Sequence, residues 1–387
     1  MYEKKIWENG EVIQAKDLNN MEEGILKNSN KINDIVNMLG MVDNWKVVQQ
    51  LIKEGYGADV FPIGTQLRCS HSVYGEIIWD VVAHDYNLEE ESEHSMTLLS
   101  HDCIVNSMQY DAVEALYYAE TQLVAGTYYF SLLSGYDTNY GGGKNIQFTL
   151  TRPVPAGGVI MFPWAYNTQS TATKISTYSS RESTSALETV TVTEGTSGTN
   201  LGTTDGKTAN MNHIHRVRYG SNNWEESAIR QFLNSNVEAG SVWTPQTKFD
   251  RPPSWTANTD GFMKGFDEDF LSVVSECDHL TKTNSVFEID GNLSKIYTTK
   301  DRFYLASHSE IFGGSENNLA DGTQFPYYNE ATNTDRIKYN AETARYWWLR
   351  SPIPSYAHFV RLVPTDGSLS NANASSSYGV AVACVIC

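Results

Sequence analysis

The sequence has no long apolar run, no basic segment and no cysteine framework, and each absence excludes a class of protein. No stretch approaches about eighteen consecutive apolar residues, which excludes a membrane-spanning helix. The 28 lysines and arginines stand against 46 acidic residues, a net charge of −18 with no local basic patch, so we expect no nucleic-acid binding. Five scattered cysteines do not form a disulfide framework, and Met1–Trp7 lacks the apolar core of a signal peptide. We therefore expect the chain to fold in a reducing cytoplasm.

Motifs that carry known chemistries are also missing. There is no G-x-S-x-G elbow, no H-E-x-x-H and no phosphate-binding glycine loop. His213 and His215 lack a nearby third metal ligand, and Asp267–Asp269 lacks the spacing of a calcium loop, so it is interpreted as the start of a helix. Cys384 and Cys387 form a C-x-x-C without a second pair, which favours a structural role. No pair of carboxylates stands out for glycoside hydrolysis. We expect no enzyme activity, no cofactor and no metal.

What is present is a globular composition with many aromatic side chains. The chain of 387 residues is 40% hydrophobic and 12% aromatic, enough for two or three domains with cores of their own. Abundant tyrosine and tryptophan are typical of a β-rich core or a recognition surface.

A seven-residue hydrophobic repeat runs through residues 18–43 and predicts a short coiled coil. One seam position holds Leu18, Ile25, Ile32 and Leu39, and the other holds Met21, Asn28, Ile35 and Val42. Asn28 fits a residue that fixes register and oligomer state, and the isoleucines favour three strands. The alternative is an amphipathic helix that lies on its own domain.

The body alternates between strand and helix patterns. We expect a connector helix in 44–57, and strands at 63–67, 76–83, 96–100 and 301–307. We also expect helices at 111–120, 223–234 and 267–277. Between 121 and 204 the chain is rich in Thr, Ser and Gly, with strand patterns at 126–132, 145–150, 158–162 and 189–193. This segment predicts a small antiparallel insertion, which is either a sugar-binding module or a structural extension.

Two parts of the sequence resemble known protein families. Trp7-x-x-Gly10-Glu11-Val12-Ile13-x-Ala15-x-Asp17-Leu18-Asn19-x-Met21-Glu22-x-Gly24-Ile25 resembles the N-terminal segment of phage tail and baseplate proteins from viruses of Gram-positive gut bacteria. This likeness implies that residues 1–17 attach the protein to a virion and that residues 18–43 begin a trimer.

The second resemblance rests on three motifs in order: Asn223-Trp224-x-x-Ser227-x-x-Arg230-x-x-Leu233-Asn234, Thr299-x-Asp301-Arg302-Phe303-Tyr304-Leu305-x-Ser307-x-x-Glu310-x-x-Gly313, and Trp347-Trp348-Leu349-Arg350-Ser351-Pro352. Together they resemble a domain family related to the C-type lectin fold. It implies an α+β domain over 58–387 that carries the β-rich insertion and follows the short N-terminal coiled-coil helix.

Residues 345–387 further resemble the variable region of proteins diversified by retroelements. The likeness rests on Leu349–Pro352, Thr365–Leu369 and Gly379–Ile386, with Val382 in place of an expected proline. The scaffold positions that it implies are Trp347, Trp348, Leu349, Pro352, Val360, Gly367, Leu369 and the last strand. The rewritten, ligand-binding positions that it implies are Ile353, Tyr356, His358, Phe359, Leu362, Pro364, Ser370, Ala372, Ser375, Ser377 and Tyr378. Asn371 and Asn373 are expected to be template-like positions left unchanged.

The segment between the apolar ends has the composition of a binding surface, independently of that likeness. Its aromatic side chains have few rotamers to immobilise, and its Ser and Asn side chains make adaptable hydrogen bonds. An ordinary loop with buried aromatics is the plainer interpretation.

The function implied is host recognition by a homotrimeric phage or prophage tail protein, made in the bacterial cytoplasm and located in the virion. Its partners would be a bacterial surface protein or glycan and, through the N-terminus, other tail or baseplate proteins. A tail-associated glycan-degrading enzyme and a purely structural tail protein are the alternatives.

Overall fold

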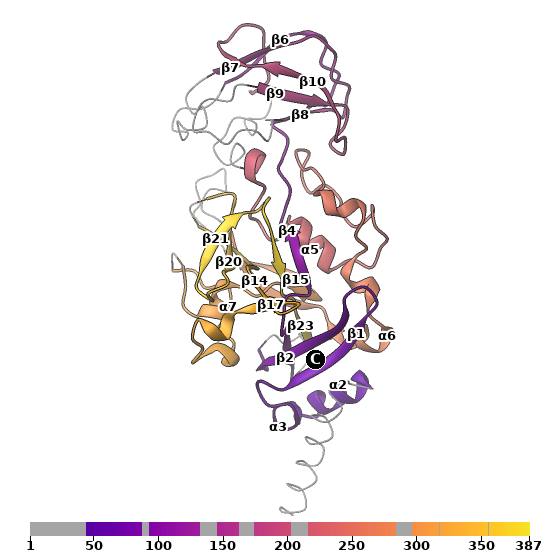
Figure 1. Ribbon diagram of the computed structural model, residues 1–387, viewed down its shortest axis with the longest axis vertical. Coiled ribbons are helices and arrows are strands. Elements are labelled where there is room, and N and C mark those ends of the chain that lie inside the picture. Colours follow the sequence, from indigo (N-terminus) through magenta and orange to yellow (C-terminus); the bar gives the residue numbers. More distant parts are fainter. Residues whose placement is uncertain are drawn as a thin grey trace, which may run out of the picture.

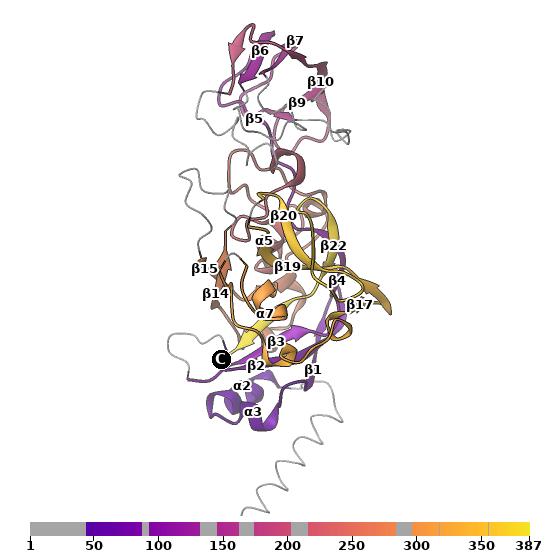
Figure 2. The same ribbon diagram turned by 90° about the vertical axis from the view of Figure 1, so that its left-hand side faces the viewer.

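The described part of the chain is built mainly of β-strands, with a few short helices. The computed structural model describes residues 44–86, 93–131, 145–161, 174–202, 216–283, 296–316, 318–354 and 356–387. The molecule is elongated: a β-rich module lies at one end, a mixed sheet in the middle, and a larger sheet with two helices at the other end (Figures 1 and 2). The predicted attachment segment and coiled coil, 1–17 and 18–43, lie outside the described residues.

The predicted connector helix is confirmed as α2, Trp45–Lys53, which is followed by the short α3, Gly57–Val60. Asn44 caps α2, because its side-chain oxygen accepts a hydrogen bond from the backbone N–H of Val47 at 3.2 Å. One face of α2 is buried against the body through Trp45, Val48 and Ile52. Among the described helices, none is long and apolar enough to cross a membrane.

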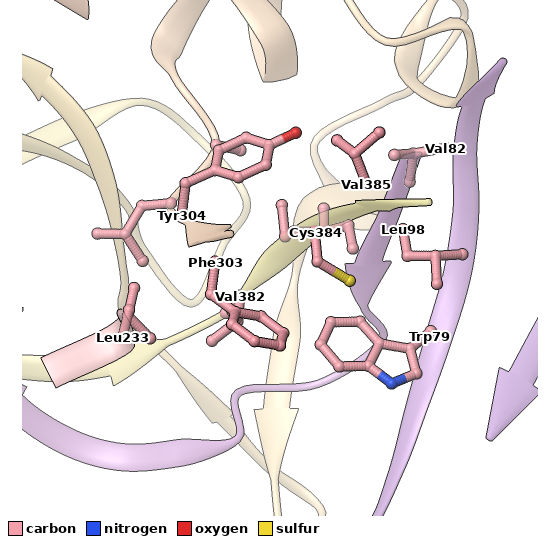
Figure 3. Close-up of a cluster of buried hydrophobic side chains, with 14 of the residues drawn as sticks. Trp79, Val82, Leu98, Leu233, Phe303, Tyr304, Val382, Cys384 and Val385 are labelled. Carbon is pink, nitrogen blue, oxygen red and sulfur yellow. The ribbon is translucent and has the colours of Figure 1, made fainter. Parts of the chain in front are cut away.

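The larger sheet has six strands, and the last strand of residues 345–387 lies in its interior. Its order is β1 (Gln66–His71), β2 (Gly75–His84), β3 (Met96–Ser100), β23 (Ala383–Ile386) and β13 (Val274–Ser275), and β16 (Phe303–Tyr304) also pairs with β23. Every residue of β23 is buried, so the prediction that the last strand belongs to the core is confirmed. Figure 3 shows β23 side chains Cys384 and Val385 among those of Trp79, Leu98 and Phe303.

The middle sheet has five strands and contains most of the predicted variable region. Its order is β21 (Ser370–Asn373), β20 (Phe359–Val363), β19 (Trp347–Pro352), β22 (Ser377–Val380) and β4 (Val105–Gln109). β19 and β22 run parallel, and the other pairs are antiparallel. The predicted scaffold residues Trp347, Trp348, Leu349 and Val360 have no exposed surface. Two residues, Ala381 and Val382, lead from β22 into β23 and so join the two sheets.

Short helices and hairpins fill the space around these sheets. Three helices are α5 (Ala228–Leu233), α6 (Glu268–Leu271) and α7 (His308–Phe312), and the 3-10 turns are Ser254–Ala257, Phe262–Gly265, Pro326–Tyr328 and Thr334–Arg336. The hairpins are β14 (Cys277–Lys282) with β15 (Ile296–Asp301), and β17 (Lys338–Asn340) with β18 (Thr343–Arg345). The predicted helices at 223–234 and 267–277 are therefore present but shorter. In each, a capping side chain, Ser227 or Asp267, fixes the first turn.

The chain forms strands between 121 and 204, as predicted. Together with residues 117–118 they make two packed four-stranded sheets, called the sandwich, in which one strand pair is parallel and not antiparallel as expected. One sheet has the order β10 (Ala186–Thr191), β9 (Lys174–Tyr178), β8 (Val159–Met161) and β5 (Tyr117–Tyr118). The other has the order β11 (Thr193–Glu194), β7 (Asn145–Leu150), β6 (Gly126–Ser131) and β12 (Thr199–Asn200). Both sheets contribute to one apolar core that includes Phe130, Phe148, Ile160 and Ile175. The core begins at Leu116, slightly before the predicted boundary of 121.

The predicted helix at 111–120 is wrong, because tertiary contacts override its helix-forming composition. The side chain of Asp111 accepts a hydrogen bond from the N–H of Ala112 at 2.9 Å, which favours a turn over a helix. Leu116 then donates to the carbonyl of Ile160, and Ala119 donates to that of Gly158, each at 2.8 Å. The segment is thus drawn out along the sandwich.

A buried ion pair organises the C-terminal half of the body. The Arg350 guanidinium, on β19, contacts both carboxylate oxygens of Glu310 on α7, at 2.5 and 2.8 Å. It also donates to the carbonyls of Leu280, Leu305 and Asp321. Glu310 in turn closes a capping box with Ser307 at the start of α7. Both charged side chains are essentially inaccessible to solvent, so their hydrogen bonds must replace water completely.

We predict that Glu310→Gln lowers the free energy of unfolding by about 3–5 kcal/mol, because it leaves the Arg350 charge buried without a counter-ion. Urea unfolding measures this loss. Glu76→Gln is the matched control, since it breaks an ion pair with Arg68 of similar length, 2.8 Å, whose side chains are 45% and 37% exposed. The control should cost less than about 1 kcal/mol. Equal losses in the two variants would contradict the assigned role of the buried pair.

A second charged cluster lies where the chain leaves the body for the sandwich and where it returns. Arg216, in a helical turn at 216–219, donates to Glu114 at 2.7 Å and to Glu226 at 2.9 Å. Burial raises the pKa of Glu114 to about 7; Arg216 opposes the shift, and Asp250 adds to it. Burial also raises the pKa of Asp111, together with the nearby carboxylates of Asp250 and Glu114.

Because the pKa of Glu114 is raised, we predict that the free energy of unfolding falls as the pH rises. The folded state favours protonated Glu114, so its contribution is complete below the ordinary pKa of 4.5 and is lost as the pH rises through about 7. The shift corresponds to about 3 kcal/mol. We expect urea unfolding to show declining stability between about pH 5 and pH 8, and Glu114→Gln to make the decline shallower while Glu76→Gln leaves it unchanged. A wild-type stability that rises over this range would contradict the prediction.

Candidate ligand-binding surface

The motif residues that carry the second resemblance hold the body together. The Asp301 carboxylate accepts hydrogen bonds from the Trp224 indole at 3.1 Å and from Arg230 at 2.6 Å. The Asn234 side chain accepts the backbone N–H of Arg302 at 2.8 Å and donates to the carbonyl of Phe303 at 2.9 Å. These side chains connect α5 to β15 and β16. A binding function therefore has to be sought on the surface that this framework positions.

The β20–β21 hairpin provides such a surface. Antiparallel register pairs Phe359 with Asn373 and Arg361 with Asn371, so these four side chains share one face of the hairpin. We call this set the outer face. The opposite, inner face carries Val360 and Leu362 with their partners Ala372 and Ser370. Val360 and Leu362 are buried, while every outer-face residue is partly or fully exposed.

The predicted ligand-binding positions differ in their exposure to solvent. Tyr356 and Ser377 are exposed, and Ile353, Phe359, Ser370, Ala372 and Tyr378 are partly buried. The remaining four, His358, Leu362, Pro364 and Ser375, are buried. Leu362 belongs to the main core, so its assignment to a displayed surface is wrong. Ser370 and Ala372 share its inner face for the same reason: side chains of a strand alternate with a period of two.

The outer face contains three residues that are absent from the predicted ligand-binding set. Asn371 and Asn373 were expected to be unchanged template-like positions, and Arg361 was not singled out. The alternation of Phe359, Val360, Arg361 and Leu362 could have identified Arg361 from the sequence.

A cluster of rings adjoins the outer face, defined here as the aromatic cluster: Tyr219, Tyr356, His358 and Phe359. The ring of His358 stacks on Tyr219 at 4.9 Å and lies 4.1 Å from Phe359, and Tyr356 packs edge-on to Phe359 at 5.0 Å. Tyr356 is 45% exposed and forms the accessible tip of the cluster. His358 is buried beneath it and supports the rings. Sequence reasoning missed Tyr219, because it follows the insertion and lies far from the other three along the chain.

The backbone that carries these rings is fixed by groups outside the cluster. The buried amide of Asn222 donates to the carbonyls of Tyr356 and Phe359, at 2.7 and 2.9 Å. The N–H of Ile353 donates to the carbonyl of Phe359 at 2.9 Å, and that of Ala374 donates to His358 at 2.9 Å. These bonds use backbone carbonyls of the loop and none of its side chains, so they would remain when the exposed side chain of Tyr356 is changed.

A tight turn closes the hairpin. Gly367 has a positive φ of 73° and donates to the carbonyl of Pro364 at 3.0 Å. A Cβ at this position would lie 1.6 Å from the carbonyl oxygen of Asn333. Only glycine fits both conditions, so Gly367 is required by the backbone of the turn.

Charge on the outer face is neutralised locally. Glu316 pairs with both Arg361 and the buried Lys282, which donates at 2.8 Å. Burial alone would raise the pKa of Glu316, but hydrogen bonds and charges from Lys282 and Arg361 outweigh it and lower that pKa. The surface therefore presents aromatic rings and amides without a strong net charge of its own.

The acidic run Asp267–Asp269 makes structural contacts. Asp267 caps α6, and Asp269 accepts the backbone N–H of Trp45 at 2.8 Å, in agreement with a helix start. Within the described residues, no group of three or more His, Cys, Asp or Glu side chains could hold a metal ion. His213 and His215 lie outside the described residues, as do the seven predicted oligomerisation residues, Leu18, Met21, Ile25, Asn28, Ile32, Ile35 and Leu39.

Comparison with protein families matches the C-terminal part of the chain. Residues 197–387 match the model of a family described as a domain of unknown function, DUF6273. The matched range contains the Asp301 framework, the Arg350 ion pair and the β20–β21 hairpin, and it leaves out most of the sandwich. No curated protein and no solved structure matches the chain.

We predict that Asn222→Ala loosens the 353–359 loop without altering its side chains. The substitution removes the partner of two backbone carbonyls and should cost about 1–3 kcal/mol. Hydrogen exchange of the Ile353 and Ala374 amides should accelerate, while exchange in β23 stays unchanged. Asn258→Ala, which removes an exposed amide, is the control and should leave the rates within error. Unchanged protection at Ile353 would show that Asn222 does not hold the loop.

Proposed function

We propose that the protein is the receptor-binding protein of a phage or prophage tail, and that the outer face and aromatic cluster bind a ligand on the bacterial surface. The observation that carries this proposal is that hydrogen bonds to backbone carbonyls hold the loop beneath exposed side chains. Asn222 and neighbouring backbone groups bind the loop carbonyls, while Tyr356 on the loop and Asn371 on β21 have exposed side chains. Rings with few rotamers beside adaptable amides are the composition of a paratope.

The proposal includes diversification by a retroelement and a C-type-lectin-like fold. Its support is the resemblance of residues 345–387, together with the separation of scaffold from surface in the hairpin. Trp347, Trp348 and β23 anchor the segment in the core, so substitution at outer-face positions would leave that anchoring intact. In this proposal the rewritten set gains Asn371 and Asn373 and loses Leu362.

The proposal also includes location in the virion and assembly as a homotrimer. Residues 1–17 would attach the chain to other tail or baseplate proteins, and residues 18–43 would join three copies. Three linked sites convert weak binding at each surface into avidity. The proposed mechanism is recognition of a surface protein or glycan, without turnover.

We predict that Tyr356→Ala reduces binding to host cells while the fold is retained. The test uses the labelled full chain on a panel of intact Gram-positive gut bacteria, and the strains that it binds are then used for the variants. Loss of an exposed aromatic anchor should weaken binding at least about tenfold. Tyr56→Ala is the matched control, because Tyr56 is 53% exposed at the opposite end of the body, beside α3.

Pretreatment of the cells separates the two ligand classes. Protease treatment should abolish binding to a protein receptor, and periodate oxidation should abolish binding to a glycan. Equal binding by wild type, Tyr356→Ala and Phe359→Ala, with all three folded, would refute the assignment of this surface.

A further inference from the structure

Two buried thiols from distant parts of the chain lie in contact. The sulfur atoms of Cys277 and Cys387 are 4.0 Å apart, and the residues are separated by 110 positions in the sequence. Neither cysteine is in a disulfide, and each is 1% exposed. Cys277 begins β14, and Cys387 directly follows β23.

The C-x-x-C formed by Cys384 and Cys387 is a worse pair than its spacing suggests. Positions three apart in an extended strand point to opposite faces. Cys384 lies on β23 beside Trp79 and Leu98 in the main core (Figure 3). Cys387 instead meets the thiol of Cys277. The thiol next to that of Cys387 is therefore Cys277, and not Cys384 as the C-x-x-C spacing suggests.

The surrounding structure holds these two thiols together. β23 lies between β3 and β13 and also pairs with β16, which fixes the strand leading to Cys387. The side chain of Gln49, on α2, donates to the carbonyl of Cys387 at 2.7 Å. Cys277 pairs with Asp301 across the β14–β15 hairpin. A disulfide needs the sulfur atoms to approach to about 2.05 Å, a movement of about 2 Å between two side chains that are already neighbours.

We propose that Cys277 and Cys387 form a disulfide when the protein meets a low-molecular-weight disulfide such as oxidised glutathione. One protein thiol loses its proton to solvent, and its thiolate attacks a sulfur of the small disulfide, forming a mixed disulfide and releasing one glutathione thiolate. The second protein thiolate then attacks the mixed disulfide, which forms the protein bond and releases the second glutathione. Two protein thiols are oxidised, one small disulfide is reduced, and the protons end on the released glutathione.

The disulfide would close a loop of chain that contains the candidate ligand-binding surface. Residues 277–387 include β19, β20, β21 and β22, together with α7 and the Arg350–Glu310 pair. Closing a loop of this length lowers the conformational entropy of the unfolded chain, which stabilises the folded state relative to it. The reduced chain would fold in the cytoplasm, and oxidation outside the cell would then lock the framework behind the binding surface. This inference does not depend on which ligand the surface binds.

The test is oxidation of the full chain in glutathione buffers, at a temperature near the onset of unfolding so that the buried thiols can be reached. Alkylation after denaturation, followed by intact mass measurement, counts the remaining thiols. The reduced chain should show five alkylated thiols and the oxidised chain three, five minus the two that are bonded. Peptide mapping of the oxidised wild type should join the Cys277 peptide to the Cys387 peptide, and the melting temperature should rise by about 5–10 °C.

Variants provide the control. Cys277→Ser should keep all four of its remaining thiols after oxidation, whereas Cys384→Ser should still lose two. Five alkylated thiols in the oxidised wild type, or a linked peptide that joins a different pair, would overturn the proposal. A linked pair that lowers the melting temperature would overturn its stabilising role.

Discussion

The buried ion pair between Arg350 and Glu310 is the constraint on which the rest of the C-terminal half depends. Arg350 lies within β19, the strand from which the β20–β21 hairpin continues, and its guanidinium also binds carbonyls of β14 and of the loop at Asp321. Removing two charges from water costs several kcal/mol, so the arrangement is stable only while every hydrogen bond is made. That requirement fixes the relative positions of β14, β19 and α7, and therefore the position of the hairpin.

The framework and the surface use different kinds of bond. In the framework, side chains such as Asp301, Asn234 and Glu310 bind other side chains and backbone groups, so their identities are fixed by their partners. At the surface, Asn222 binds two backbone carbonyls of the 353–359 loop. The exposed side chains of Tyr356 and Asn371 can then vary while these backbone bonds remain. A surface of this kind can change its ligand without a change of scaffold, which is what the proposed function requires.

Sequence reasoning succeeded where a pattern is local and failed where long-range contacts decide. Local patterns predicted β3, β7 and the apolar character of β19 and β23. Burial alternates along β7, whereas every residue of β3, β19 and β23 is buried. The helix predicted at 111–120 is absent, since hydrogen bonds to β8 are formed only in the folded chain. The same limit hid Tyr219 and the contact between Cys277 and Cys387. Leu362 was misplaced for a different reason: the family likeness implies a ligand-binding residue there, but the Leu362 side chain lies on the buried inner face of β20.

The most direct test is a stability scan of every substitution from 345 to 387, measured by resistance to protease on displayed full-length chains. If backbone bonds alone hold the surface, most substitutions at Tyr356, Phe359 and Asn371 should leave resistance unchanged, and most polar substitutions at Val360, Leu362 and Val385 should abolish it. Outer-face positions that prove as intolerant as these core positions would contradict the separation of framework from surface.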